Sequence, residues 1–303
     1  MHIYLPIAGQ SVNALVIVLL GFGVGILSGM FGIGGGFLTT PLLIFYGIPP
    51  TVAVASATTQ ITGASVSGAM VHMRRGGVDL KMAGVMIVGG LFGSFVGAAL
   101  FRMLQASGQI DVVINLLYVV ILAGIGGLMV KDSIAALSSR GANAEEQKPR
   151  RHNRWVASLP LRWRFYSSGL YISPIAPLAI GFLAGVLTVL LGIGGGFILV
   201  PAMIYLLGMP ARVVIGTSLV MILTVSAGTT MIHSLTTRAV DIVLAALLLV
   251  GGVIGAQYGA VLTTRLKPDY LRLALAVIIL LVALRMFLGL FWRPDEIFSI
   301  EYL

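Results

Sequence analysis

The chain has 303 residues, of which 58% are hydrophobic and only 10% are charged, and it carries a formal net charge of +9 with no cysteine. Soluble domains carry about 25% charged residues, so this composition excludes an ordinary soluble protein and indicates a membrane protein. The missing cysteines exclude disulfides, thiolate metal sites and cysteine nucleophiles. Because Lys and Arg lie in loops between apolar runs, we expect the positive charge to orient the chain in a bilayer rather than to bind nucleic acid.

Long charge-free stretches predict helices that span a membrane. Lys, Arg, Asp and Glu are absent from residues 1–73, 82–101, 112–130, 165–211, 213–237 and 242–264. A charged side chain at the bilayer centre costs about 3 kcal/mol, and backbone in lipid must satisfy its own hydrogen bonds, which selects helices. The expected fold class is an all-α integral membrane protein with about 8–10 membrane segments, multi-pass in a bacterial inner membrane. No basic region precedes the first apolar run, so we expect a structural span there and not a signal peptide.

Apolar runs place the expected helical elements along the chain. They lie at residues 12–31, 37–46, 52–73, 80–104 and 111–130 in the first half, and at 175–191, 197–207, 213–234, 241–263 and 270–291 in the second. As helices, the short pieces 37–46 and 197–207 would each be about 15 Å long, half of the roughly 30 Å hydrocarbon core. Neither can cross the bilayer alone, so we expect Gly-broken or re-entrant short helices at these two positions.

The two halves of the chain repeat each other. A shift of 160 residues aligns Gly21–Pro41 with Gly181–Pro201, and eleven of these twenty-one positions are identical. The shift grows to 161 and then to 162 along the following helices, as expected for two small loop insertions. A repeat of this length predicts two homologous helical units, an N-terminal transmembrane repeat at 12–130 and a C-terminal one at 174–291.

A basic linker, residues 131–173, separates the two units. Residues 131–164 hold eight of the nineteen Lys and Arg residues, which predicts a cytoplasmic location under the positive-inside rule. We expect Ser138–Arg154 to be polar and mobile. The aromatic residues after it predict an interfacial segment, although binding of a partner to this region stays open: Trp155, Trp163, Phe165 and Tyr166.

Two topologies fit these elements. If each short piece and its flanks complete a crossing, each half has five crossings and the halves are inverted. A piece that dips and returns gives four crossings and parallel halves. The inverted arrangement places most basic loops on one side, so the positive-inside rule favours it, with both termini outside. These loops contain Arg74, Arg75, Lys81, the linker, Arg265, Lys267 and Arg272.

Each half contains the same hexapeptide, Gly-Ile-Gly-Gly-Gly-Phe, at residues 32–37 and 192–197. Four glycines in five positions oppose a continuous helix, at about 1 kcal/mol each relative to alanine. Broken backbone at membrane depth survives only where protein buries it or where it lines a polar cavity, and amides at a half-helix N-terminus attract anions. Close helix packing through small residues is the alternative role for these glycines. Neither motif has the Lys and Ser or Thr of a nucleotide loop. We therefore expect an anion site lined by Gly34, Gly35, Gly36, Gly194, Gly195 and Gly196.

Other glycines are expected to serve packing. Gly89, Gly93 and Gly97 are spaced four apart on one predicted helix. Small residues at this spacing let two helices approach closely in a membrane. We therefore predict a helix contact, not a binding site, along this stripe.

Uncharged polar side chains follow each glycine motif in an otherwise apolar run. Hydroxyl and amide groups can coordinate an anion without the cost of burying a formal charge. The same groups could instead hydrogen-bond to their own helix or to a neighbouring helix, and both alternatives stay open. The candidate side-chain donors are Ser56, Thr58, Gln60, Thr217 and Ser218.

The motifs resemble those of the sulfite exporter TauE/SafE family of permeases. The doubled Gly-Ile-Gly-Gly-Gly-Phe carries the resemblance, with Pro41 or Pro201 after it and then Gly-x-Pro at 47–49 or 208–210. The similarity spans residues 12–130 and 174–291. It implies export of sulfite, sulfoacetate or another small organic or sulfur-containing anion, driven by an ion gradient. The halves differ at 55–57, Ala-Ser-Ala, and 216–218, Gly-Thr-Ser, so the two half-sites are not strictly equivalent.

Coupling to a proton gradient needs a group that changes its protonation. His72 and His233 occupy equivalent repeat positions and are the proton-coupling candidates, since histidine titrates nearest to physiological pH. Both lie at predicted span ends, where a histidine can simply face the headgroups, and the substrate itself could carry the proton. Asp79 and Asp241, just beyond, are expected to cap helices.

An intramembrane hydrolase and a membrane scaffold are the alternative classes. No stretch contains the Gly-x-Ser-Gly or Gly-x-Ser-x-Gly turn of a serine nucleophile. Duplicated half-sites suit alternating access better than a single nucleophile, and a scaffold leaves the twin breaks unexplained. We therefore expect a transporter and not an enzyme, with no metal and no cofactor. Its expected partners are a small anionic substrate and the lipid bilayer, and homo-oligomer formation stays open.

Overall fold

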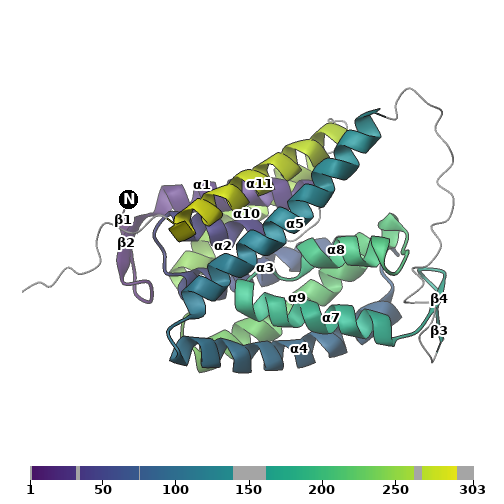
Figure 1. Ribbon diagram of the computed structural model, residues 1–303, viewed down its shortest axis with the longest axis horizontal. Helices are drawn as coiled ribbons and strands as arrows, with labels where there is room; N and C mark the ends of the chain where they lie inside the picture. The colour runs from purple at the N-terminus through teal and green to yellow at the C-terminus, as the bar shows by residue number, and fades with distance from the viewer. Residues whose placement is uncertain (1, 32–34, 75, 139–161, 263–267, 292–303) are drawn as a thin grey trace, which may run out of the picture.

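The computed structural model describes residues 2–31, 35–74, 76–138, 162–262 and 268–291 (Figure 1). Several expectations lie outside these residues: Gly34 in the first glycine motif, the polar part of the linker from residue 139 onward, Trp155, and the basic residues Arg75, Arg265 and Lys267.

The described helices follow the predicted order in both halves. The first half contains α1 (Ala14–Phe31), α2 (Gly36–Phe45), α3 (Pro50–Arg74), α4 (Leu80–Ala106) and α5 (Ile110–Ser138). The second half contains α7 (Ile175–Leu191), α8 (Gly196–Tyr205), α9 (Ala211–Thr236), α10 (Ile242–Leu262) and α11 (Pro268–Phe291). The bounds agree with the predicted runs within two residues, except that α5 continues to Ser138.

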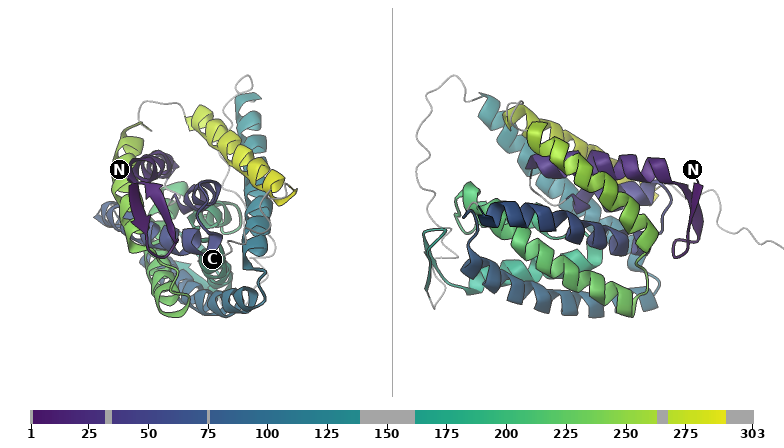
Figure 2. Two further views of the ribbon diagram at one scale, coloured as in Figure 1. Left: turned by 90° about the vertical axis from the view of Figure 1, so that its left-hand side faces the viewer. Right: turned by 180° about the vertical axis from the view of Figure 1, so that it is seen from behind.

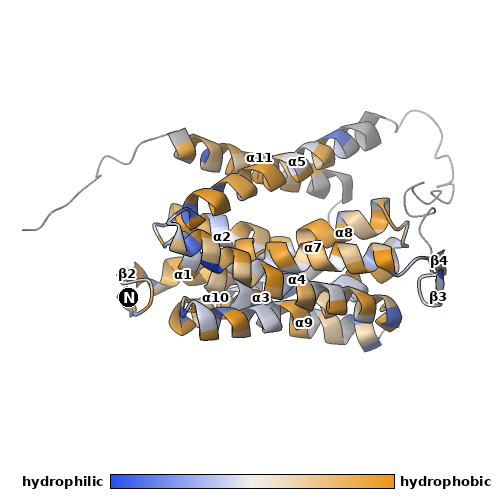
Figure 3. Cartoon of the chain, turned by 60° about the horizontal axis from the view of Figure 1, so that its bottom comes forward, coloured by the Kyte–Doolittle hydropathy of each residue, from blue (hydrophilic) through white to orange (hydrophobic). Residues whose placement is uncertain are grey.

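Apolar length makes this a multi-pass membrane protein. Five of the described helices are long and apolar enough to cross a membrane: Leu80–Ala106, Ile110–Lys131, Val213–Thr236, Ile242–Gly259 and Leu273–Leu290. The short helices α2 and α8 have 10 residues each, as expected of pieces that cannot cross alone. Figure 3 shows hydrophobic residues along most of the length of the helices. The all-α membrane class with Gly-broken short helices is therefore confirmed.

Two β-hairpins, which the apolar pattern did not predict, precede α1 and α7. Antiparallel pairs form between β1 (His2–Leu5) and β2 (Gln10–Asn13), and between β3 (Trp163–Phe165) and β4 (Leu170–Ile172). The hairpins lie at opposite ends of the long axis (Figures 1 and 2). The second one occupies the end of the linker, where the sequence predicted an interfacial segment.

Reciprocal helix pairs hold the two halves together. Helix α1 lies along α10, and α4 lies along α7. Glycines make both contacts close, because a Cβ at Gly255 would collide with the backbone of α1, and a Cβ at Gly93 would collide with that of α7. Gly89 and Gly97 also face the backbone of α7. The glycine stripe on α4 therefore serves helix packing, as its spacing predicted.

Corresponding helices of the two halves run in opposite directions. Gly68 on α3 faces Leu219 on α9, whereas Gly77, just beyond α3, faces Gly216 earlier on α9. Helices α3 and α9 are thus antiparallel neighbours. Helix α1 starts at the end of the molecule that holds β1 and β2, and α7 starts at the end that holds β3 and β4 (Figure 1). These directions favour the inverted arrangement over the parallel one.

A buried aspartate, Asp79, connects the two halves at one end of the molecule. Its Oδ1 accepts a hydrogen bond from the Met82 amide at 3.0 Å, which caps α4. Its Oδ2 accepts from the Ser168 hydroxyl at 2.7 Å and the Ser168 amide at 3.1 Å, in the turn between β3 and β4. The Asp79 amide donates to the Thr217 hydroxyl of α9 at 3.0 Å.

Asp241 makes the corresponding set of contacts at the other end. Its Oδ1 accepts from the Leu244 amide at 3.1 Å, which caps α10, and its Oδ2 accepts from the Ile7 amide at 3.0 Å, in the turn between β1 and β2. Its own amide donates to the Ser56 hydroxyl of α3 at 3.2 Å. Both aspartates therefore cap helices, as expected, and each also joins a hairpin and a helix of the other half.

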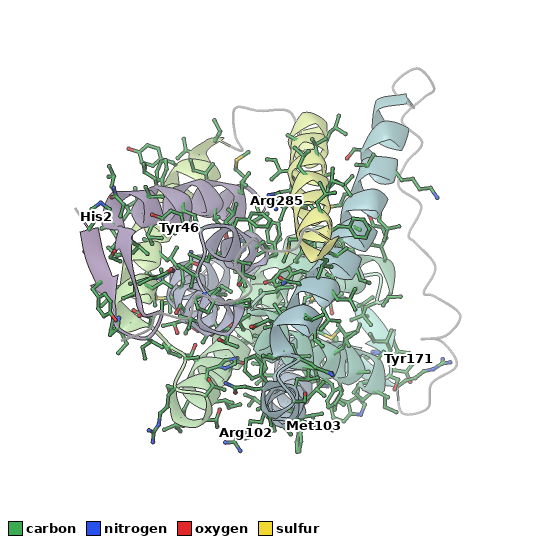
Figure 4. All side chains as sticks on the ribbon, turned by 60° about the vertical axis from the view of Figure 1, so that its left-hand side comes forward. His2, Tyr46, Arg102, Met103, Tyr171 and Arg285 are labelled. Carbon is green, nitrogen blue, oxygen red and sulfur yellow. The ribbon has the colours of Figure 1, made fainter. Side chains whose placement is uncertain are left out.

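Side chains fill the space between these helices (Figure 4). Arg102, near the end of α4, and Tyr171, on β4, lie at the periphery of the bundle and are exposed. The interior between the described helices also contains buried polar side chains, and those around the glycine breaks are described next.

Candidate substrate site beside the first glycine break

Both glycine motifs interrupt the helical backbone. In the second half α7 ends at Leu191, and Gly192, Gly194 and Gly195 have φ of 68°, 71° and 75°. In the first half Gly35, with φ of 66°, directly precedes α2 as its N-cap. Left-handed backbone costs other residues about 1–2 kcal/mol because of their Cβ. The glycines therefore permit two breaks inside the bundle.

The two breaks lie next to each other, and the contact between them is apolar. A Cβ at Gly36 would lie 2.7 Å from the Gly192 carbonyl oxygen. The Phe37 and Phe197 rings stack with their centroids 4.5 Å apart and an interplanar angle of 5°. Ile61 of α3 packs beside the breaks, against Gly36 and Gly194. The described parts of the two breaks therefore face each other, and the pocket described next lies on the side of the first break away from this contact, since no residue of the second break lines it.

A small pocket lies beside the first break, and its lining is mainly apolar with three polar side chains. It is formed by α1, α3, α9, α10 and the glycine that precedes α2, and its lining includes Ser28, Gly35, Gln60, Ser65, Leu219 and Gly252. Its volume is ≈ 40 Å³, and a water molecule needs roughly 10–15 Å³ on the same measure. The pocket therefore has room for a few water molecules or a small anion.

The Gln60 side chain is oriented to donate hydrogen bonds into this pocket. It is only 4% exposed, and its Oε1 accepts a hydrogen bond from the Thr39 hydroxyl at 3.0 Å. The Nε2 group consequently faces Gly252, where a Cβ would lie only 2.8 Å from it. Glycine at this position leaves room for the amide, whose two N–H groups are donors.

Ser65 supplies a second polar group that the protein leaves unsatisfied. Its side chain is 1% exposed, and its hydroxyl has no hydrogen-bond partner within the described residues. A buried polar group without a partner costs about 1–3 kcal/mol. A ligand that accepts a hydrogen bond from Ser65 would remove this cost.

The pocket contains no formal charge. None of its lining residues is ionisable, and the stretches that supply them, 1–73, 213–237 and 242–264, contain no Lys, Arg, Asp or Glu. The N-terminus of α2, which begins at Gly36 after Gly35, contributes a partial positive charge of about half an elementary charge. These neutral donors and the start of α2 can hold a small anion in the pocket. They neutralise its negative charge only in part.

Among the predicted side-chain donors, Gln60 lines the pocket. Ser56 and Thr217 accept hydrogen bonds from the amides of the two capping aspartates. Thr58 and Ser218 donate to carbonyl groups of their own helices, at 2.7 and 3.0 Å. The hydroxyls of these four residues are therefore engaged in contacts within the protein.

The predicted glycines also divide into groups. Gly35 lines the pocket. Gly36 and Gly194 border Ile61, while Gly195 and Gly196 begin the second short helix. Gly34 lies outside the described residues. Of the predicted glycines that the structure describes, Gly35 is the one that lines this pocket.

The two candidate histidines have different surroundings. His233 is fully buried, and its Nε2 lies 3.1 Å from the Val189 carbonyl oxygen, to which it must donate because a carbonyl only accepts. Its Nδ1 lies 3.3 Å from the Thr237 hydroxyl. His233 thereby holds the last turn of α7, immediately before the second break. His72 is half-buried in the last turn of α3, so only His72 has access to the surroundings expected at a span end.

Sequence reasoning missed three polar residues at the site. Ser28 lies on α1 seven positions before Gly35, Thr39 lies in the first turn of α2, and Ser65 lies on α3 beyond Gln60. A search for small polar residues within two helical turns of each glycine motif would have found Ser28 and Thr39. No local pattern distinguishes Ser65 from the other hydroxyls of α3.

Comparisons with known proteins place this architecture among transporters. A family model described as "Sulfite exporter TauE/SafE" matches residues 17–286. The chain is 29% identical to the probable membrane transporter protein YjnA of Bacillus subtilis (strain 168) over 275 residues, which cover 89% of this chain and 98% of that relative. It is 28% identical to a probable membrane transporter protein of Xylella fastidiosa (strain 9a5c) over 258 residues, covering 84% and 87%.

A more limited similarity extends to a plant protein. The chain is 28% identical to the Arabidopsis thaliana "Sulfite exporter TauE/SafE family protein 1" over 107 residues, which cover 35% of this chain and 24% of that protein. No solved structure matches the chain.

Proposed function

The chain belongs to the sulfite exporter TauE/SafE family of membrane transporters, and from this premise we propose that it exports a small oxyanion across a bacterial inner membrane. The substrate class is sulfite or an organic sulfonate or carboxylate. We place its binding site in the pocket beside the first glycine break, which joins α1, α3, α9 and α10.

The orientation of Gln60 is the observation that supports an anionic substrate. Because Thr39 occupies the amide oxygen at 3.0 Å, the part of Gln60 that faces the pocket is its N–H₂ group, which can only donate. The unpartnered hydroxyl of Ser65 adds another donor. A ligand with several acceptor oxygens and a negative charge satisfies these groups better than a cation, which would need acceptors.

Neutral donors also suit a substrate that must leave. A transported ion has to bind well enough to enter the site and weakly enough to be released. Gln60 and Ser65 can stabilise an anion without the strong attraction of a buried Lys or Arg, which the lining lacks. This combination supports a transport site rather than a storage or signalling site.

Coupling to an ion gradient is part of the same proposal, with a proton as the coupling ion. His72 and His233 remain the candidate groups, and a protonated substrate is the alternative. His233 contacts the end of α7 beside the second break, so a change in its charge would alter the contact between α9 and α7. The sensitivity of transport to His233→Gln over a range of pH would report on this role, because glutamine keeps a donor but cannot titrate.

Replacement of Gln60 tests the proposed site. In proteoliposomes loaded with radiolabelled sulfite, Gln60→Leu should lower efflux or raise KM by about tenfold or more, since a hydrogen bond to a charged group contributes roughly 1.5–3 kcal/mol. Gln257→Leu is the matched control, because Gln257 is exposed on α10 and carries the same chemical change outside the pocket. It should transport like the wild type.

Thermal unfolding in detergent should show that both variants are folded. Normal efflux by a folded Gln60→Leu protein would remove the pocket from the transport path. The glycines are poorer probes, because a side chain at Gly35, with φ of 66° and Ser28 Cβ 3.1 Å from the added Cβ, would strain the backbone whether or not an anion binds there.

A further inference from the structure

We propose that the two glycine breaks are functionally unequal: the first carries the single substrate site of the chain, and the corresponding space at the second is closed by Met221 and Val225. This inference rests on the function proposed for the first pocket. It assigns to those two apolar side chains the role of excluding substrate from the second half.

The repeat identifies the residues that correspond to the pocket. With shifts of 160 at the break, 161 on α3 and α9, and 162 on α4 and α10, Gly35 corresponds to Gly195 and Gly252 to Gly90. Contacts support this correspondence, because a Cβ at Gly35 would lie 3.4 Å from Ser28 Oγ, and one at Gly195 would lie 3.5 Å from Thr188 Oγ1. Gly35 and Gly195, the last glycine before each short helix, therefore have the same left-handed conformation and similar neighbours.

The side chains that face this backbone differ. Gln60 corresponds to Met221, and Ala64 corresponds to Val225. At Gly252 an added Cβ would meet Gln60 Nε2 at 2.8 Å, whereas at Gly90 it would meet Met221 Cε at 2.8 Å and Val225 Cγ2 at 2.6 Å. A methyl group thus occupies the place of the amide donor, and valine adds two carbons where Ala64 leaves the first pocket open.

Burial follows the same division. Val225 and Thr188 are fully buried, whereas their counterparts Ala64 and Ser28 in the first pocket are half-buried; Gln60 and Met221 are both buried. The hydroxyl that corresponds to Ser28, that of Thr188, donates to a carbonyl of its own helix at 2.7 Å. Apolar side chains therefore take up the second space, and an anion there would lose its hydration without gaining an amide donor, which is unfavourable.

A buried serine marks the second space as the counterpart of the first. Ser226 corresponds to Ser65, is fully buried, and likewise has no partner for its hydroxyl within the described residues. Both positions thus have the same kind of unsatisfied group, and Ser65 lines the pocket beside the first break, whose lining does not include Ser226. The chain should consequently bind one substrate anion, and the second half should contribute structure and movement rather than a second site.

Because the chain has no cysteine, single thiols can compare the two positions directly. Ser65→Cys and Ser226→Cys are nearly isosteric changes. Each variant is treated in detergent with methyl methanethiosulfonate, a small neutral reagent. The thiolate attacks the sulfenyl sulfur, a new S–S bond to the S-methyl group forms, methanesulfinate leaves, and the thiol proton passes to water. Mass spectrometry measures the rate at which the S-methyl group is added.

We expect Ser65→Cys to react at least about tenfold faster than Ser226→Cys, because a packed thiol reacts only when the structure opens locally. In the background Met221→Gln with Val225→Ala, the thiol at position 226 should react at a rate that approaches that of position 65. Both thiols should react fully after denaturation in SDS. Equal rates in the native protein, or a faster reaction at position 226, would overturn the inequality of the two breaks.

An unchanged labelling rate at position 226 in the Met221→Gln, Val225→Ala background would show that these two side chains do not close the second space. If the doubly substituted background proves unstable, Val225→Ala alone and the comparison of the two single thiols still decide the matter. A separate measurement tests the proposed function: methanesulfonate, which does not react with the reagent, should slow labelling at position 65. Labelling that is fast but unprotected would contradict the substrate site and leave the inequality of the breaks intact.

Discussion

Among single side chains, Thr39 is the one that hydrogen-bonds to the Gln60 amide oxygen, which leaves the N–H₂ end of the amide toward the pocket. Its hydroxyl donates to Gln60 Oε1 at 3.0 Å and both residues are almost completely buried. Without this bond the amide could rotate and present its oxygen, which would repel an anion. The donor character of the pocket therefore depends on a residue that need not touch the substrate.

We predict that Thr39→Val raises the KM for sulfite efflux about two- to twelvefold, which corresponds to the 0.5–1.5 kcal/mol of one hydrogen bond. The maximal rate should change less. Thr58→Val is the matched control, since the Thr58 hydroxyl donates to the Ala55 carbonyl of its own helix at 2.7 Å. Proteoliposome efflux measures both, and equal effects of the two substitutions would contradict the positioning role of Thr39.

At the scale of the elements, the hairpins and helix starts are linked through the two aspartates. Asp79 holds the turn between β3 and β4 to the start of α4, and Asp241 holds the turn between β1 and β2 to the start of α10. Each also contacts a helix of the other half. Because the hairpins lie at opposite ends of the molecule, the two sets of contacts restrain both ends of the bundle.

We predict that Asp79→Ala destabilises the protein by at least about 1–2 kcal/mol, because a lost N-cap alone costs roughly this amount. Hydrogen exchange should increase at β3 and β4 and stay unchanged at β1 and β2, while Asp241→Ala should show the opposite pattern. Asp111→Ala is the control, since Asp111 is exposed in the first turn of α5 and should cost less than about 1 kcal/mol. Increased exchange at both hairpins in either variant would rule out separate anchoring.

For the whole molecule, the distribution of charge limits what can be carried. The pocket has no ionisable lining residue, and the helices around it contain no charged residue near it. The cost of moving an ion out of water rises with the square of its charge, and an unpaired buried ion already costs several kcal/mol. A doubly charged anion would therefore be strongly disfavoured relative to a singly charged one.

We predict that methanesulfonate and hydrogen sulfite are transported at least about tenfold faster than sulfate, a dianion at neutral pH, since a difference of about 1.4 kcal/mol suffices for this ratio. Sulfite efflux should rise as the internal pH falls, because the singly charged form becomes more abundant. Efflux of methanesulfonate, which keeps one charge throughout, serves as the control for pH effects on the protein. Equal flux of sulfate and methanesulfonate would exclude selection by charge state.

The sequence by itself determined the membrane class, the order and bounds of the helices, the two glycine breaks and the packing role of Gly89, Gly93 and Gly97. These features depend on local properties: charge-free length, the cost of glycine in a helix and the spacing of small residues. The same properties placed Gln60 among the candidate donors. They did not predict the hairpins, whose strands are too short to show a clear alternating pattern.

Only the tertiary structure decided which of the polar residues form a pocket and which serve the fold. Contacts join residues that are nearly two hundred positions apart, such as Gln60 with Gly252 and Ser56 with Asp241. These contacts exist because α10 packs against helices of the first half. The proposed difference between the halves also depends on contacts in space. In the sequence Met221 is an ordinary apolar residue, and it can fill the second space only because its methyl group lies over Gly90. Hydrogen bonds and packing contacts form between residues that are neighbours in space, and the sequence repeat does not show which residues these are.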